Sequence, residues 1–179
     1  MSKVNIADFT NKLDALNRAY SKLPNEIAAT AVNFSKERFR DQAWLDKTKE
    51  TWKPRARSRQ GGSKRSQTLL VNTGRLKRGI RKVRADENVI IIGNDVPYAQ
   101  VHNDGGIITG SVMVKQHTKK EYDRYRKGRK EIVKSHKVSS HIRKLHIKIP
   151  ARKFIGNSYT LERRIYLLIT ARFIKALKQ

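Results

Sequence analysis

Two strands and the turn between them are predicted by residues 81–93 of this 179-residue chain: Arg81-Lys82-Val83-Arg84-Ala85-Asp86-Glu87-Asn88-Val89-Ile90-Ile91-Ile92-Gly93. Residues 81–85 partly alternate between basic and apolar side chains, which is typical of a strand. Residues 88–93 are a β-branched run, so we expect a strand that is buried on both faces. Asp86-Glu87-Asn88 predicts a hairpin turn. A small antiparallel sheet is therefore the centre of the predicted fold.

Upstream of this sheet, the apolar spacing predicts two amphipathic helices. The first covers residues 4–20, where apolar side chains recur at helical intervals. Pro24 disfavours helix in the residue before it, so we expect a second helix to begin there and to reach about Trp44. We expect Trp44 and Trp52 to anchor the following chain by aromatic packing.

Downstream, two more strands and a long helix are predicted. Ile107–Val114 and residues 142–149 resemble strands, and residues 158–178 have apolar side chains on one broad helical face. The predicted fold class is α+β: N-terminal helices, a small antiparallel β-sheet from about 80–115 and 142–149, and a long C-terminal helix packed on the sheet. The expected segments are an N-terminal helical segment 1–45, a basic loop 46–67, and an α+β core 68–179 with a basic insertion at about 116–140.

The net charge of +26 indicates polyanionic or acidic partners more than it indicates a fold. It is concentrated in residues 46–84 and 115–153, each with a net charge of +12, around an acidic and apolar centre. Residues 46–67 have no apolar period and are expected to be a loop, and residues 116–140 are expected to be a solvated helix or a flexible arm. Contacts to DNA or to acidic partners are predicted for Arg55, Arg57, Arg59, Lys64, Arg65, Arg124, Arg126, Lys127, Arg129 and Lys130.

The sequence argues against most catalytic and ligand-binding classes. The chain has no cysteine, which removes disulfides, cysteine-based zinc sites and thiol catalysis. His102 lies near Asp95 and Asp104, but no serine occupies a Gly-x-Ser-x-Gly turn, so we expect His102 to fix its loop through a side-chain hydrogen bond to the backbone. We expect no cofactor and no metal. Because no signal peptide and no apolar run of about 18 residues is present, we also expect no membrane segment.

Three further histidines and one glycine-rich stretch do not form recognisable sites. His136, His141 and His146 are five residues apart, so three of them share neither a helix face nor a strand face. Residues 60–66 contain Gly, Lys and Ser without the spacing of a phosphate-binding loop.

Three separated motifs, in order, resemble the tail-completion or virion-morphogenesis proteins of tailed bacteriophages and prophages. The first contains Thr73-Gly74-Arg75-Leu76, the second runs from Tyr98-Ala99 through His102 to Gly105-Gly106, and the third is Pro150-Ala151-Arg152-Lys153-Phe154-Ile155-Gly156. Together with the terminal helix, the resemblance covers about residues 69–178.

The resemblance implies a non-enzymatic structural protein at the neck or tail terminus of a virion. Its expected partners are other phage neck, connector and tail proteins and a homo-oligomeric ring of copies, with a hexamer as the working hypothesis. It also implies that the motif residues serve assembly: Thr73, Gly74, Arg75, Leu76, Tyr98, His102, Gly105, Gly106, Pro150, Ala151, Arg152 and Phe154. The alternatives are a sequence-independent nucleic-acid-binding protein and, less favoured, a toxin-like nuclease.

Overall fold

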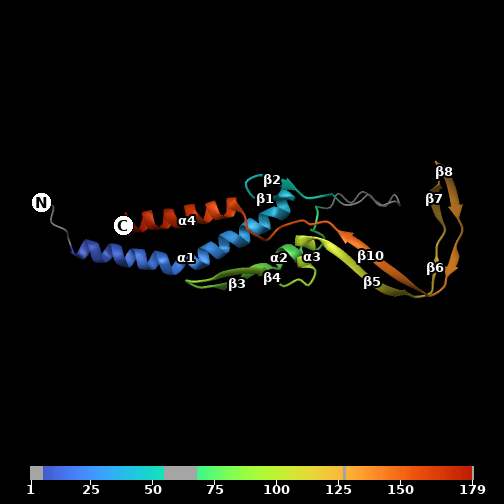
Figure 1. Cartoon of the computed structure of the whole chain (residues 1–179), viewed down its shortest axis with the longest axis horizontal. Coiled ribbons are helices and arrows are strands. Elements are labelled where there is room, and N and C mark those ends of the chain that lie inside the picture. The colour runs from blue at the N-terminus through green and yellow to red at the C-terminus, as the bar shows by residue number, and fades with distance from the viewer. Residues whose placement is uncertain (1–5, 55–67, 127, 179) are drawn as a thin grey trace. The chain divides into compact units, whose positions relative to one another are not determined.

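The computed structural model describes residues 6–54, 68–126 and 128–178, except for the side chain of Arg126. The helices in this part of the chain, labelled in Figure 1, are α1 (Ile6–Asp41), α2 (Arg75–Arg78), α3 (Ala99–Asp104) and α4 (Tyr159–Leu177). None of the described helices is long and apolar enough to cross a membrane. The α+β fold class predicted from the sequence is confirmed.

The described strands form two-stranded antiparallel pairs, not the single small sheet that we predicted. The pairs are β1 (Ala43–Leu45) with β2 (Lys49–Thr51), β3 (Ile80–Ala85) with β4 (Ile90–Asn94), β5 (Gly106–Val114) with β10 (His141–Ile149), β6 (His117–Lys119) with β9 (His136–Val138), and β7 (Tyr122–Arg126) with β8 (Arg129–Val133). The chain divides into two compact units: unit 2 is Gly106–Ile149, and unit 1 comprises the residues before and after it.

Helix α1 is one continuous helix of 36 residues, so the predicted break at Pro24 is wrong. A proline inside a helix removes one hydrogen bond at a cost of about 3 kcal/mol. Leu23, Ala28 and Ala31, which flank the proline, are buried, and this packing offsets that cost. Figure 1 shows the helix bending near its middle, and a proline is a usual cause of such a bend.

The predicted hairpin of strands β3 and β4 is confirmed, but the prediction that the second strand is buried on both faces is wrong. The Ile91 side chain is 44% exposed, because the sheet has only two strands and α1 packs against one of its faces. The turn is held by Asp86, whose carboxylate accepts hydrogen bonds from the backbone N–H groups of Asn88 and Val89.

The expected loop at 46–67 differs from the structure at its start, where β2 pairs with β1. Trp44 and Trp52 are buried as predicted, and the indole of Trp52 donates a 2.9 Å hydrogen bond to the carbonyl of Lys153. Residues 55–67 lie outside the described part of the chain.

The main core of unit 1 gathers side chains from segments far apart in the sequence. Its buried members are Phe39, Trp52, Leu76, Ile80, Val96, Ala99 and Phe154. The ring centroid of Phe39 lies 5.6 Å from that of Trp52, in an edge-to-face arrangement, and 5.1 Å from that of Phe154. These aromatic contacts join α1, the β1–β2 hairpin and the Pro150–Gly156 motif in one packed unit.

Helix α4 packs mainly along α1, whereas the sequence predicted that it would lie on the sheet. Its start is set by Ser158, whose hydroxyl accepts a hydrogen bond from the N–H of Leu161 and donates one to the carbonyl of Leu45. Ion pairs join the two helices: Arg164 with Glu37 at 2.8 Å and Arg172 with Glu26 at 2.7 Å. The sequence placed α4 within one residue at each end but did not indicate its partner.

Unit 2 is built from paired strands, so the predicted alternative of a solvated helix at 116–140 is wrong. Its charged sequence has too few apolar residues to show the period of a strand. The pairing follows instead from two hairpin arms, β5–β6–β7 and β8–β9–β10, that face each other in antiparallel register.

Replacing Phe154 by Ala should destabilise the protein by about 3–5 kcal/mol, since this side chain is 1% exposed in the main core. Denaturant unfolding of the variant and the parent measures the difference. Tyr125→Ala is the control, because Tyr125 is 73% exposed and its loss should change stability by less than about 0.5 kcal/mol. Equal stability of Phe154→Ala and the parent would contradict the packing.

Candidate functional site

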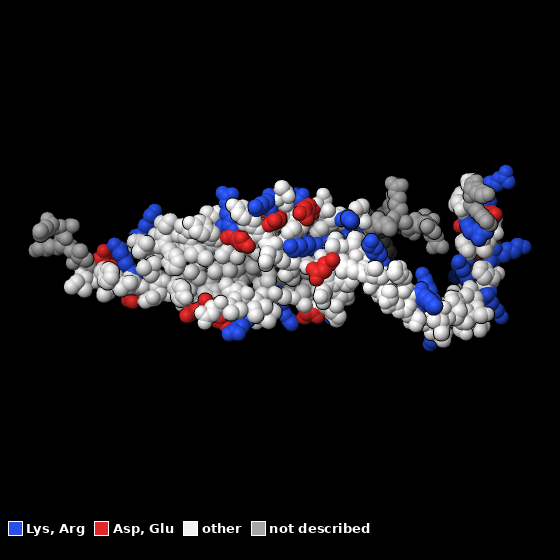
Figure 2. Space-filling view, in the orientation of Figure 1, with Lys and Arg blue, Asp and Glu red and all other residues white. Residues whose placement is uncertain are grey.

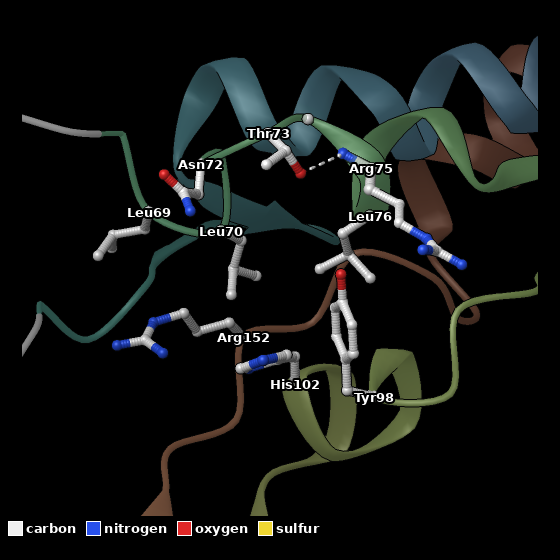
Figure 3. Close-up of a pocket in the computed structure, with 10 residues that line it drawn as sticks. Leu69, Leu70, Asn72, Thr73, Arg75, Leu76, Tyr98, His102 and Arg152 are labelled. Atoms are coloured by element: carbon white, nitrogen blue, oxygen red, sulfur yellow. Dashed lines mark hydrogen bonds between the residues drawn. The ribbon is translucent and has the colours of Figure 1, made fainter.

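The three motifs predicted from the sequence converge on one pocket of unit 1, with a volume of about 260 Å³. Figure 3 shows its walls: the segment 69–76, the side chains of Tyr98 and His102 from α3 and the residue before it, and Arg152. The pocket lining contains two arginines and no carboxylate. This convergence of distant segments makes the pocket the candidate functional site.

The first wall is shaped by backbone conformations that few residues adopt. Gly74 has φ 73 and precedes α2, and a Cβ there would lie 2.9 Å from the Arg78 guanidinium. Gly74 occupies the N-cap position of α2, and the Thr73 hydroxyl accepts a long hydrogen bond of 3.4 Å from the N–H of Arg75. Leu76 is buried, and its carbonyl accepts a hydrogen bond from the Asn94 side chain.

Gln42 holds the start of this wall and was not singled out from the sequence. Its side-chain oxygen accepts a 2.6 Å hydrogen bond from the N–H of Leu69, and its amide donates to the Leu69 carbonyl at 3.3 Å. Gln42 and Leu70 both have positive φ, of 52° and 60°. A non-glycine residue with positive φ costs free energy, so the contacts of Gln42 must maintain this shape.

The Pro150–Gly156 motif is fastened to α3 by backbone hydrogen bonds. The side-chain oxygen of Asn103 accepts from the N–H groups of Phe154 and Ile155, at 2.9 Å and 3.0 Å. The N–H of Arg152 donates to the carbonyl of His102 at 2.9 Å. Asn103 was missed from the sequence, because a carboxamide that binds backbone 51 residues away leaves no periodic signal.

Arg152 connects the same motif to the chain after β2. Its side chain is buried, and its guanidinium donates to the carbonyls of Lys53, at 2.9 Å and 3.0 Å, and of Pro54. The guanidinium of Arg152 is therefore bound to backbone carbonyls that lie about 100 residues before it in the sequence. An arginine with several carbonyl acceptors fixes backbone geometry and is held in place by it.

His102 makes a different contribution from the one expected. Its Nδ1 atom is buried and has no hydrogen-bond partner among the described residues, so the predicted side-chain bond to backbone is absent at that atom. Its ring packs edge-to-face on Tyr98, at a centroid distance of 5.8 Å. Burial, and secondarily the positive charge of Arg152, lower the pKa of His102 below its ordinary value of 6.5.

The remaining motif residues define where the site ends. Gly105 has φ 77 and ends α3 in a conformation that favours glycine, whereas Gly106 is the first residue of β5 and pairs with Ile149. Pro150 is half-buried, and Ala151 is exposed.

The predicted basic contacts are not part of this pocket. Arg55, Arg57, Arg59, Lys64, Arg65, Lys127 and the Arg126 side chain lie outside what the structure describes. Arg124 pairs with Glu131 at 2.8 Å and Lys130 with Asp123 at 3.0 Å, across strands β7 and β8. Arg129 is exposed and has no ion-pair partner in the described part of unit 2.

His102 should make stability depend on pH below its ordinary pKa. In the unfolded chain His102 binds a proton near pH 6.5, whereas the lowered pKa in the folded chain moves this protonation to a lower pH. The stability that neutral His102 contributes is therefore complete above about pH 6.5 and is lost as the pH falls below it. Thermal unfolding of His102→Gln between about pH 7 and pH 5 should therefore change less with pH than that of the parent. His146→Gln, at an exposed strand position, is the control. Parallel pH profiles for His102→Gln and the parent would contradict this account.

Comparison with known proteins gives one match. A family model described as the phage virion morphogenesis family matches residues 2–173, a range that includes all three motif segments. No curated protein and no solved structure matches the chain.

Proposed function

Because the chain belongs to the phage virion morphogenesis family, we propose that it completes the tail of a tailed phage or prophage and joins the tail to the head. In this role it acts without catalysis, in the virion neck or tail terminus, by assembling with its own copies and with other neck, connector and tail proteins. The working arrangement is a ring, with a hexamer as the first hypothesis to test.

The observation that carries the proposal is an uncovered apolar stripe on the N-terminal half of α1. Ile6, Phe9, Leu13 and Tyr20 are each at least 43% exposed, and with Leu16 they recur at the spacing of three and four residues that packs one helix against another. Helix α4 also exposes large apolar side chains, at Tyr166, Leu167, Ile174 and Leu177. Extended apolar stripes of this kind mark surfaces that another protein covers.

Unit 2 offers a second surface for assembly. Residues directly opposite each other in an antiparallel pair share a face, so one face of β5–β10 carries Ile108, Val112, Leu145 and Ile147. An isolated two-stranded ribbon is marginally stable in water, which supports the covering of this face by a neighbouring copy. A contact between unlike surfaces of identical copies closes into a ring when its rotation permits.

The pocket supports the same role indirectly. Arg152 in its lining, together with Gln42 and Asn103 beside it, holds the surrounding backbone segments together. We therefore assign the three motifs to the shaping of the subunit, which presents the apolar surfaces in a defined way.

A double substitution, Phe9→Ser with Leu13→Ser, should leave the subunit folded, because both side chains are exposed. It should lower the molar mass of the oligomer that the purified protein forms, measured by light scattering after gel filtration. It should also reduce the yield of joined particles when the variant complements a phage that lacks the gene.

Asn11→Ser with Asp14→Ser is the matched control, since these exposed polar residues lie on the same helical turns. The control should assemble as the parent does. Normal molar mass and full head–tail joining by the Phe9/Leu13 variant would contradict an assembly role for this stripe.

A further inference from the structure

The β5–β10 ribbon of unit 2 has a polar, basic face opposite its apolar one. The strand register places Lys148 opposite Ile107, His146 opposite Thr109, and Lys144 opposite Ser111 on this face. Ile142 and Met113 border it at the far end. All the polar members of this face are exposed.

The positive charge of unit 2 is largely uncompensated. Residues 106–149 contain thirteen Lys and Arg and three Asp and Glu. Two of these carboxylates are occupied by Arg124 and Lys130. Exposed side chains without an ion-pair partner in the described part of this unit are Lys115, Lys120, Arg129, Lys134, Lys137, Arg143, Lys144 and Lys148. Figure 2 shows Lys and Arg side chains projecting from unit 2, most of them over the end that carries β6 to β9, with few acidic ones between them.

We infer that unit 2 binds double-stranded DNA through its phosphates, without reading the sequence. The width of a two-stranded β-ribbon suits the major groove of B-DNA. Lys144 and Lys148 are four residues apart on one strand, about 13 Å at the usual rise, which is close to the groove width of about 12 Å. Ser111 and Thr109 add hydroxyl donors of the kind that contact phosphate oxygens.

The composition of this face favours a nucleic acid over an acidic protein. Lysine is depleted in protein–protein interfaces, whereas Lys, Arg, Ser and Thr supply most contacts to phosphates. The face offers no aromatic or arginine anchor of the type that dominates the binding energy between proteins. This inference goes beyond the assembly role, and neither depends on the other.

The test measures the affinity of the full chain for two short DNA duplexes of unrelated sequence, by fluorescence anisotropy at several salt concentrations. The parent should bind both duplexes similarly, and its affinity should fall steeply between about 50 and 200 mM salt. Lys137→Gln, Lys144→Gln and Lys148→Gln, combined in one variant, should weaken binding more than about tenfold at about 0.1 M salt. The salt slope should fall by about 2 to 3, because each phosphate contact contributes about 0.9.

The matched control combines Arg163→Gln, Lys175→Gln and Lys178→Gln, which removes the same charge from exposed positions on and after α4. Circular dichroism and thermal unfolding of both variants exclude misfolding. The control should bind DNA within about twofold of the parent.

Failure of the parent to bind, or equal losses in both variants, would overturn the inference. Competition by polyglutamate at the same charge concentration, as effective as unlabelled duplex, would also overturn it and would point to an acidic protein. If the chain forms oligomers and joins particles but does not bind DNA, only the DNA-binding inference is overturned, and the proposed assembly role stands.

Discussion

The packing of Phe39 between Trp52 and Phe154 is the contact on which the architecture of unit 1 depends. Phe39 belongs to the last turns of α1, Trp52 follows β2, and Phe154 comes from the motif that leads into α4. The three rings therefore join segments that are up to 115 residues apart in the 179-residue chain. Since buried aromatic side chains contribute several kcal/mol each, this cluster supplies much of what holds a small core together.

Hydrogen bonds around these rings determine the direction of each segment. Asn103 binds the backbone of Phe154 and Ile155, Trp52 donates to the carbonyl of Lys153, and Arg152 donates to the carbonyl of Lys53. Apolar packing alone is non-directional, so the polar contacts are what orient α3 and the Pro150–Gly156 motif relative to β2. The pocket is the space left between these oriented segments. Its residues line a cavity as those of a binding site do, but the contacts of Arg152 in its lining hold backbone segments together.

Much of this arrangement could be predicted from local patterns. The β-branched run at 88–93 and the apolar face of 158–178 are signals within single segments, and both elements form within two residues of the expected bounds. The break at Pro24 was wrong because burial on both sides of the proline outweighs its local cost. The strands at 117–138 were missed because their pairing rests on hairpin register in a charged sequence. Gln42 and Asn103 were missed because side-chain bonds to distant backbone have no local signature.

A division between residues that hold the subunit together and surfaces that remain exposed also bears on the function. Residues of the three motifs form the interior joint of unit 1, while the apolar stripe of α1 and the two faces of unit 2 remain uncovered in the single chain. Leu76, Arg152 and Phe154 are the buried residues among those predicted to serve assembly, so we expect their substitution to act through loss of subunit shape, not through loss of a reacting group.

Hydrogen exchange followed by mass spectrometry, on the parent and on Asn103→Ala, tests this joint most directly. Removing one acceptor of two backbone N–H groups should lower protection together in residues 69–76, 98–104 and 150–156, because these segments open as one cooperative unit. The middle of α4, held separately against α1, should keep its protection. Loss of protection confined to Phe154 and Ile155, with the other two segments unchanged, would contradict the account.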